Sequence, residues 1–283
     1  MPRISRLLTP WAVLWLALGL GACAHNMAIV DATVEKSQQT STPAVSPAVR
    51  QALAPSGRLR VAVYQGSPTS WVKNPQTGQS AGIAYELGQA MAQQLGVPAE
   101  VVTFSRVAEI IDALKTGQVD MTFTNATAAR AKDVDFTAPL VQLELGLLVP
   151  PGSGLTQFAD ADRAGRRIGV SLGSSSQAAL GQRLQHAKVV TATSLEVAQQ
   201  MFKQGEIDAF ATNKGILFEM LEKLPGYKVL DDRWGLENMA IAVPKQREAG
   251  RAFLESFALQ VQRDGQLKAM AERAGLRGMA AKP

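Results

Sequence analysis

A short polar stretch near the middle of the chain combines the side chains that can hold an anion. It begins as an alternating strand, ends in Thr124-Asn125, and continues into Thr127 and Arg130. Thr127 is typical of a residue that caps a helical turn, and Arg130 would lie on that turn. The arginine guanidinium presents a planar set of donors that matches a carboxylate. Hydroxyl, amide and guanidinium groups at one strand end therefore predict an anion-binding site.

The pattern around this strand occurs twice in the chain. Residues 117–125 and 205–213 align without a gap and agree at five of nine positions: glycine, a β-branched residue, aspartate, threonine and asparagine. The second segment places Asn213 at an equivalent strand end. Because ligands of open α/β sheets lie at the carboxyl ends of strands, matching ends predict a ligand held between two lobes. A chance likeness between two helix–glycine–strand units is the alternative.

Composition narrows the class of protein. The 283 residues are 46% hydrophobic and 19% charged, which suits a globular chain of one large domain or two lobes. The net charge of +5 is slight, and there is no basic run with interleaved aromatic residues, so we expect no nucleic-acid partner. His25, His186 and the single cysteine, Cys23, lack the spacing of metal ligands, and we expect no metal and no cofactor.

The start of the chain is typical of an exported lipoprotein. Residues 1–22 are interpreted as a signal peptide, because Trp11–Leu20 is a run of ten residues without a polar side chain, too short to span a bilayer. The run ends in Leu-Gly-Ala-Cys23, which resembles a bacterial lipobox and predicts a lipid anchor on Cys23. A plain signal peptide with a chance cysteine is the alternative. Residues 23–55 are rich in Ala, Ser, Thr, Gln and Pro, which predicts a flexible tether.

From about residue 56 the chain alternates strands and amphipathic helices, which predicts an α/β protein with a parallel-type sheet. A second run of this kind begins after residue 154. In that run a strand over 167–172 leads through Gly173 directly into a helix. The free N–H groups of a helix N-terminus favour an anion, and a glycine permits close approach of the backbone.

In this order, the pieces resemble the family 3 extracellular solute-binding proteins, the periplasmic receptors of polar amino-acid ABC importers. The resemblance covers about residues 58–278 and depends on the order and spacing of several motifs rather than on any single one. These motifs are Gly82-Ile-Ala-Tyr-Glu-Leu87, Thr127-x-x-Arg130, Asp135-Phe-Thr-Ala-Pro139, Gly173-Ser-Ser175, Gly205-Glu-Ile-Asp208-Ala and Asp264-Gly-Gln-Leu267.

The resemblance implies a two-lobed periplasmic-binding-protein fold of type II with two crossing segments. Lobe 1 would comprise residues 56–142 and 237–283, and lobe 2 residues 143–236. The crossings would lie near 141–143 and 234–236.

The resemblance also implies a ligand site. Arg130 would bind the ligand's carboxylate from lobe 1, and Gly173, Ser174 and Ser175 would meet the same group from lobe 2. The alternatives are a surface arginine and a simple helix cap. Trp71 falls on an aromatic position of the family that walls the pocket, with core packing as an equal alternative.

Two departures from the family affect the ligand. The loop before Arg130 is two residues shorter than usual, so contacts by Asn125 and Thr127 could be displaced. The family's carboxylate that holds an α-ammonium falls on Asn213, and losing that charged hydrogen bond would cost roughly 1.5–3 kcal/mol. We therefore expect either a carboxylate without an α-amino group or an amino acid in a changed pose.

The resulting functional prediction is the solute-binding component of an ABC importer. It would capture a small carboxylate-bearing solute, an amino acid or related organic acid, as a lipid-anchored periplasmic monomer and deliver it to an inner-membrane permease. One alternative is a lyase- or dehydratase-like enzyme on the same scaffold, for which Glu144 and Glu237 are the candidate acid–base residues. The other is a ligand-sensing domain. We expect binding rather than catalysis.

Overall fold

A computed structural model describes residues 45–73 and 77–281 of the chain. Its helices, including two short 3-10 turns, are α1 (Pro47–Leu53), α2 (Ile83–Leu95), α3 (Val107–Lys115), η1 (Arg130–Lys132), η2 (Phe158–Ala161), α4 (Ser175–Arg183), α5 (Leu195–Lys203), α6 (Lys214–Leu221), α7 (Glu248–Arg263) and α8 (Gln266–Arg273). Its strands are β1 (Leu59–Tyr64), β2 (Val72–Lys73), β3 (Ser80–Ala81), β4 (Ala99–Phe104), β5 (Thr122–Asn125), β6 (Val134–Phe136), β7 (Val141–Val149), β8 (Arg167–Ser171), β9 (Lys188–Ala192), β10 (Ala209–Asn213), β11 (Lys228–Val229) and β12 (Gly235–Pro244).

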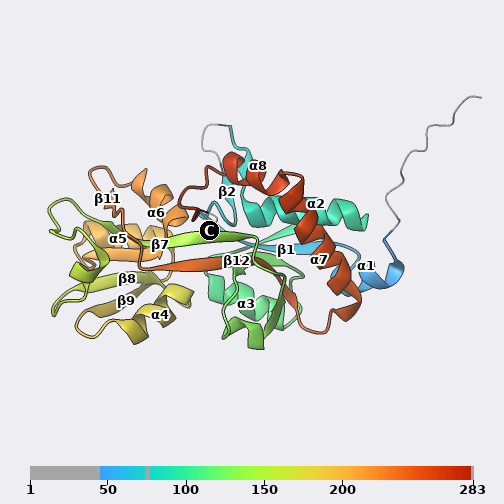
Figure 1. The fold of residues 1–283 in the computed structure, drawn as a ribbon, viewed down its shortest axis with the longest axis horizontal. Helices are drawn as coiled ribbons and strands as arrows, with labels where there is room; N and C mark the ends of the chain where they lie inside the picture. Colours follow the sequence, from blue (N-terminus) through green and yellow to red (C-terminus); the bar gives the residue numbers. More distant parts are fainter. Residues whose placement is uncertain (1–44, 74–76, 282–283) are drawn as a thin grey trace, which may run out of the picture. The chain divides into compact units, whose positions relative to one another are not determined.

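Two long antiparallel strands, β7 and β12, cross the middle of the folded part (Figure 1). They lie next to each other in an eight-stranded sheet whose main path is β5-β12-β7-β10-β8-β9. We call lobe 1 the part formed by α1 to β6 with α7 and α8, and lobe 2 the part from η2 to β11. The predicted two-lobed α/β fold with two crossing segments is confirmed, and the crossings are hydrogen-bonded strands rather than short linkers.

Each lobe contains the parallel pairing that the alternation of strands and helices predicts. In lobe 1, β1 pairs with β4, and in lobe 2, β8 pairs with β9 and β10. Helix α2 buries Leu87, Met91 and Leu95 on one face and ends at Gly96 in the left-handed conformation. One cluster of buried hydrophobic side chains contains residues of both lobes, among them Ile110 of lobe 1 and Ile216 of lobe 2. The lobes are therefore packed together.

The internal repeat predicted from the sequence has a structural counterpart. Asp120, just before β5, accepts hydrogen bonds from the backbone N–H and the guanidinium of Arg60 in β1. Asp208, just before β10, accepts the same set from Arg167 in β8. In each lobe, the repeated aspartate thus fixes the first strand against the strand that carries the Thr-Asn end.

The predicted tether boundary at residue 55 is wrong, because α1 lies inside the range 23–55. Ser46 accepts a hydrogen bond from the N–H of Val49, and Pro47 occupies the first turn, a favourable helix start. Leu53 is 2% exposed and packs on Gly250 of α7, where a Cβ atom would overlap with it. Residues 47–53 thus belong to the folded part. The signal peptide, Cys23 and the rest of the tether lie outside the described residues.

Candidate functional site

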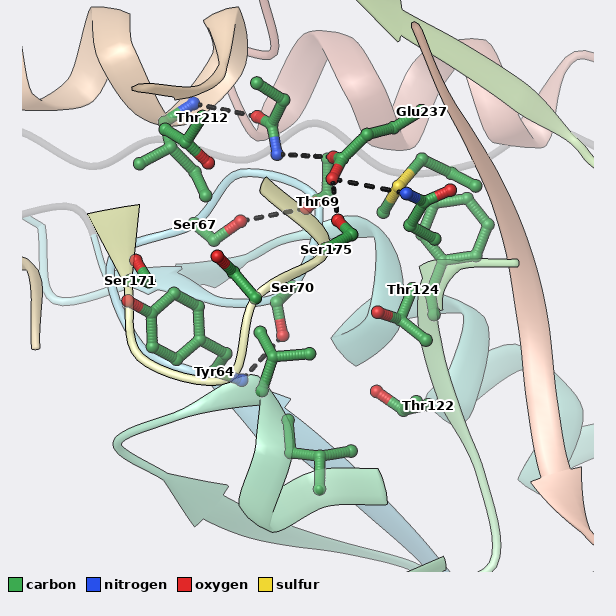
Figure 2. Close-up of a pocket in the computed structure, with 18 of the residues that line it drawn as sticks. Tyr64, Ser67, Thr69, Ser70, Thr122, Thr124, Ser171, Ser175, Thr212 and Glu237 are labelled. Atoms are coloured by element: carbon green, nitrogen blue, oxygen red, sulfur yellow. Dashed lines mark hydrogen bonds between the residues drawn. The ribbon is translucent and has the colours of Figure 1, made fainter. Parts of the chain in front are cut away.

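A cavity of about 50 Å³ lies among the strand ends of both lobes and the crossing strand β12 (Figure 2). Its lining is rich in hydroxyl groups, which come from Tyr64, Ser67, Thr69, Ser70, Thr122, Thr124, Ser171, Ser174, Ser175 and Thr212. Among the described lining residues, the charged ones are Arg130 and Glu237. This combination suits a small polar solute.

A turn over residues 126–129 joins β5 to η1, which begins at Arg130. Arg130 donates its backbone N–H to Thr127 Oγ1 at 3.2 Å, so Thr127 caps the turn as predicted. Its Nη1 donates to Thr124 Oγ1 at 3.0 Å and to the carbonyl of Asn125 at 3.2 Å. Burial lowers the pKa of Arg130, and the charge of Glu237 opposes that effect. No carboxylate of the described residues forms an ion pair with this half-buried cation, which therefore lacks the anion that would compensate its loss of solvation.

The turn into α4 approaches the cavity from lobe 2. Ser174 caps α4 by accepting a hydrogen bond from the N–H of Gln177 at 3.1 Å. The backbone N–H groups of the first helical turn have no intrahelical partner and favour an anion. Gly173 has a φ of 75°, and a Cβ atom there would overlap with Ala108 of α3 in lobe 1. The glycine thus permits close contact between the lobes.

Glu237 of β12 is a buried carboxylate that receives hydrogen bonds from both lobes (Figure 2). Its Oε1 accepts from Ser175 Oγ at 2.7 Å and from Asn125 Nδ2 at 3.4 Å. Its Oε2 accepts from Asn213 Nδ2 at 3.0 Å. All three donors are neutral, so in the described part of the chain the carboxylate is stabilised by hydrogen bonds and has no cation partner.

The two asparagines point their amide nitrogens at Glu237 for a reason that the backbone supplies. Asn125 Oδ1 accepts from the N–H of Asn238 at 3.0 Å. Asn213 Oδ1 accepts from the N–H of Ile216 at 3.1 Å and so caps α6. Because each carbonyl oxygen is committed to a backbone donor, each NH₂ group turns toward the carboxylate.

Tyr64 ends β1 at the edge of the cavity. Its backbone N–H donates to Ser70 Oγ at 2.6 Å. Burial raises the pKa of Tyr64 to about 12, against the opposing effect of the neighbouring Ser171 hydroxyl. Ser67 and Thr69 share a hydrogen bond of 2.8 Å beside it. This end of the cavity is therefore polar but uncharged.

Comparison with known proteins identifies the family. The family model for bacterial extracellular solute-binding proteins, family 3, matches residues 59–276. The chain belongs to this family. Members of this family are bacterial extracellular proteins that bind solutes. In the described part of the chain, no helix is both long and apolar enough to cross a membrane.

Individual family members agree with this assignment. The glutamine-binding protein of Geobacillus stearothermophilus is 24% identical over 250 residues, which cover 84% of this chain and 94% of that protein. The L-cystine-binding protein TcyJ of Escherichia coli (strain K12) is 25% identical over 200 residues, 69% of this chain and 74% of that one. The crystal structure of AncCDT-1, an ancestral amino acid-binding protein and precursor of cyclohexadienyl dehydratase, is 26% identical with a TM-score of 0.68, and the match covers 77% of this chain and 96% of that one. The chain is thus a solute-binding protein of the amino-acid ABC transporter type.

The structure brings five of the eight residues predicted for ligand binding to the cavity: Asn125, Arg130, Ser174, Ser175 and Asn213. The other three lie outside the described lining. Thr127 caps the turn that carries Arg130. Gly173 faces Ala108 across the contact between the lobes. Trp71 packs against the core of lobe 1, because its backbone is bridged to Gln65 and Ser67 in a tight loop.

Of the hydroxyl-bearing residues in the described lining, the sequence predicts Thr124, Ser174 and Ser175 for the site but not the others. The run Ser67-Pro-Thr-Ser70 after the first strand was the available signal, but polar loops are common and few carry a site. The two candidate acid–base residues, Glu144 and Glu237, differ in their position relative to the cavity. Glu144 lies outside the described lining, where hydrogen bonds from Lys214 at 2.8 Å and Arg233 at 3.1 Å hold it. Glu237 lies inside the cavity.

Proposed function

We propose that this family 3 protein captures a small carboxylate-bearing solute, an amino acid or a related organic acid, between its two lobes. The observation that carries the proposal is Arg130, a half-buried guanidinium that borders the cavity without an ion-pair partner among the described residues. Its described side-chain hydrogen bonds use Nη1 alone. The remaining donors are free to bind a carboxylate as a planar pair.

The carboxylate would be held from both lobes. Arg130 approaches it from lobe 1, and the first turn of α4, capped by Ser174, approaches from lobe 2. A ligand that contacts both lobes stabilises the closed arrangement, since it interacts fully with that state alone. The relatives named for glutamine and cystine binding support an amino acid as the ligand.

The closed, loaded protein would deliver its solute to an ABC permease in the inner membrane. Export through residues 1–22 and lipid attachment at Cys23 would keep the monomer in the periplasm beside that permease. The protein would return the solute unchanged, because the one carboxylate on the described lining, Glu237, is held in place by three hydrogen bonds.

A thermal-shift screen of the purified protein tests this function. The panel is the twenty amino acids with matched 2-hydroxy and 2-keto acids, because a ligand of the folded state raises the melting temperature by mass action. Arg130→Ala should weaken the best hit by at least about 100-fold, the loss that follows from removing one partner of a buried charge pair. Arg277→Ala is the matched control, since Arg277 forms an exposed ion pair with Glu222.

Two results would overturn the proposal. One is a folded protein that no member of the panel stabilises. The other is a hit that Arg130→Ala binds as tightly as the wild type does. Nuclear magnetic resonance of the mixture checks the absence of turnover, and consumption of the bound compound would favour the lyase alternative.

A further inference from the structure

The cavity contains a second unpaired charge, of opposite sign to Arg130. Glu237 is 6% exposed, and it forms no ion pair within the described ranges. Arg130 and Glu237 border the same space, yet the two side chains do not pair with each other. A buried carboxylate and a half-buried guanidinium that border one small cavity without pairing are complementary to a solute that carries both a positive and a negative charge.

We propose that Glu237 binds the cationic amino group of the solute and so replaces the carboxylate that the family resemblance places at position 213. The proposal rests on the proposed function, because it takes Arg130 as the carboxylate site. The presence of Asn213 predicts either a ligand without an α-amino group or an amino acid in a changed pose. With Glu237 in this role the ligand has an amino group, and the carboxylate that binds this group lies on the crossing strand β12.

Asn213 cannot accept the ammonium itself. Its Oδ1 is committed to the N–H of Ile216, and its Nδ2 donates to Glu237. An ammonium group consists only of donors and needs an acceptor. The asparagine therefore presents the wrong group to the solute, and its NH₂ instead orients the carboxylate of Glu237.

Glu237 has acceptor capacity left for one more donor. A carboxylate offers about four acceptor positions, two on each oxygen. Oε1 uses two of them, for Ser175 and Asn125, and Oε2 uses one, for Asn213. The position that stays open is on Oε2. Because the three existing donors are neutral, the negative charge remains available to a cation.

The rest of the lining limits the solute further. Apart from Arg130 and Glu237, the described lining residues are uncharged, and at the end near Tyr64 they are mostly hydroxyl-bearing. A charged side chain there would be desolvated without a partner. The inferred class is therefore an amino acid with a small, uncharged side chain that can form hydrogen bonds.

Calorimetric titration with matched ligands tests the role of Glu237. The ligands are the best-binding amino acid from the screen and the 2-hydroxy acid with the same side chain, and the variant is Glu237→Gln. The variant should weaken amino-acid binding by roughly 10- to 100-fold, as for one charged hydrogen bond, and leave hydroxy-acid binding within about threefold. Glu144→Gln is the matched control: it removes a glutamate from the neighbouring crossing strand, outside the described lining, and should leave both affinities unchanged.

A second variant keeps the test decisive if Glu237→Gln does not fold. Asn213→Asp places two carboxylates about 3 Å apart, and such a pair shares a proton. Binding of an ammonium-bearing ligand should expel that proton, which calorimetry detects as up to one proton released in buffers of different ionisation enthalpy. The wild-type protein should release none, and the hydroxy acid should release none from either protein.

The outcomes separate this inference from the proposed function. Equal weakening of amino acid and hydroxy acid in Glu237→Gln, or no proton release from Asn213→Asp, overturns the role of Glu237 while leaving the Arg130 site intact. Unchanged binding in Arg130→Ala overturns the proposed function itself. Stronger binding of the hydroxy acid than of the amino acid by the wild type would also overturn the inference.

Discussion

The two lobes use the same arginine–aspartate pair in different surroundings. Arg60 and Asp120 in lobe 1 repeat the hydrogen bonds of Arg167 and Asp208 in lobe 2, from the backbone N–H to both carboxylate oxygens. The side chain of Asp120 is 0% exposed, whereas that of Asp208 is 22% exposed. A short sequence pattern thus specifies the hydrogen bonds, and the rest of the chain determines how far they are buried.

The correspondence continues to the cavity. Tyr64 and Ser171 each lie four residues after the arginine of their lobe, and both line the cavity. Asn125 and Asn213 end the repeated strands, and both donate to Glu237. Equivalent positions of the two lobes therefore lie around the same cavity, but some of them present different side-chain groups to a solute.

The largest expected difference between the lobes is in stability. Asp120→Asn should cost about 3–5 kcal/mol of unfolding free energy, because it leaves Arg60 and the nearby Arg247 without a buried partner. Asp208→Asn should cost about 1 kcal/mol, since water reaches that pair. Urea denaturation measures both values. Equal losses would show that burial does not distinguish the two copies.

The next difference concerns closure. Gly173→Ala and Gly205→Ala both place a side chain at a positive φ, 75° and 64°, and both should cost about 1–2 kcal/mol of stability. Only at Gly173 would the new Cβ overlap with Ala108 of the other lobe. Gly173→Ala should therefore weaken ligand binding at least about tenfold by opposing closure.

A second substitution identifies the cause. Ala108→Gly, added to Gly173→Ala, removes the overlap and should restore most of the affinity. Binding that is equally weak in the double variant, or equally weak in Gly205→Ala, would assign the loss to backbone strain instead. Calorimetric titration with the best ligand of the screen measures all four proteins.

The smallest expected effect is a loss of stability at alkaline pH that depends on Tyr64. Its pKa rises from 10.0 to about 12 in the folded state, so above pH 10 only the unfolded state ionises and stability is lost. The loss should be about 1 kcal/mol between pH 10 and 11, and it should disappear in Tyr64→Phe. Tyr227→Phe, at a half-buried position outside the described lining, is the control and should keep the loss. An unchanged alkaline slope in Tyr64→Phe would contradict the assignment.

Much of the fold and part of the site could be predicted from local sequence. The periodicity of α2, the repeated aspartate and the Thr127–Arg130 turn are local patterns, and each has its predicted counterpart in the structure. Helix α1 also had a local signal in Ser46-Pro47, but the polar, proline-rich composition around it suggested a tether.

The role of Glu237 required long-range information. It approaches Asn125 and Asn213 only because β12 pairs with β5 on one side and with β7 on the other, which no local pattern specifies. The sequence showed a missing carboxylate at Asn213 but not the neighbouring one that strand pairing provides. Trp71 likewise matched a motif by position, whereas its packing depends on the core of lobe 1.

A co-crystal structure with the best amino acid from the screen would show directly whether Arg130 and Glu237 hold the two ends of the solute. We expect the ligand carboxylate about 3 Å from the guanidinium of Arg130 and the amino nitrogen about 3 Å from Glu237 Oε2. A ligand bound in the cavity with its amino group away from Glu237, or with its carboxylate away from Arg130, would contradict these roles.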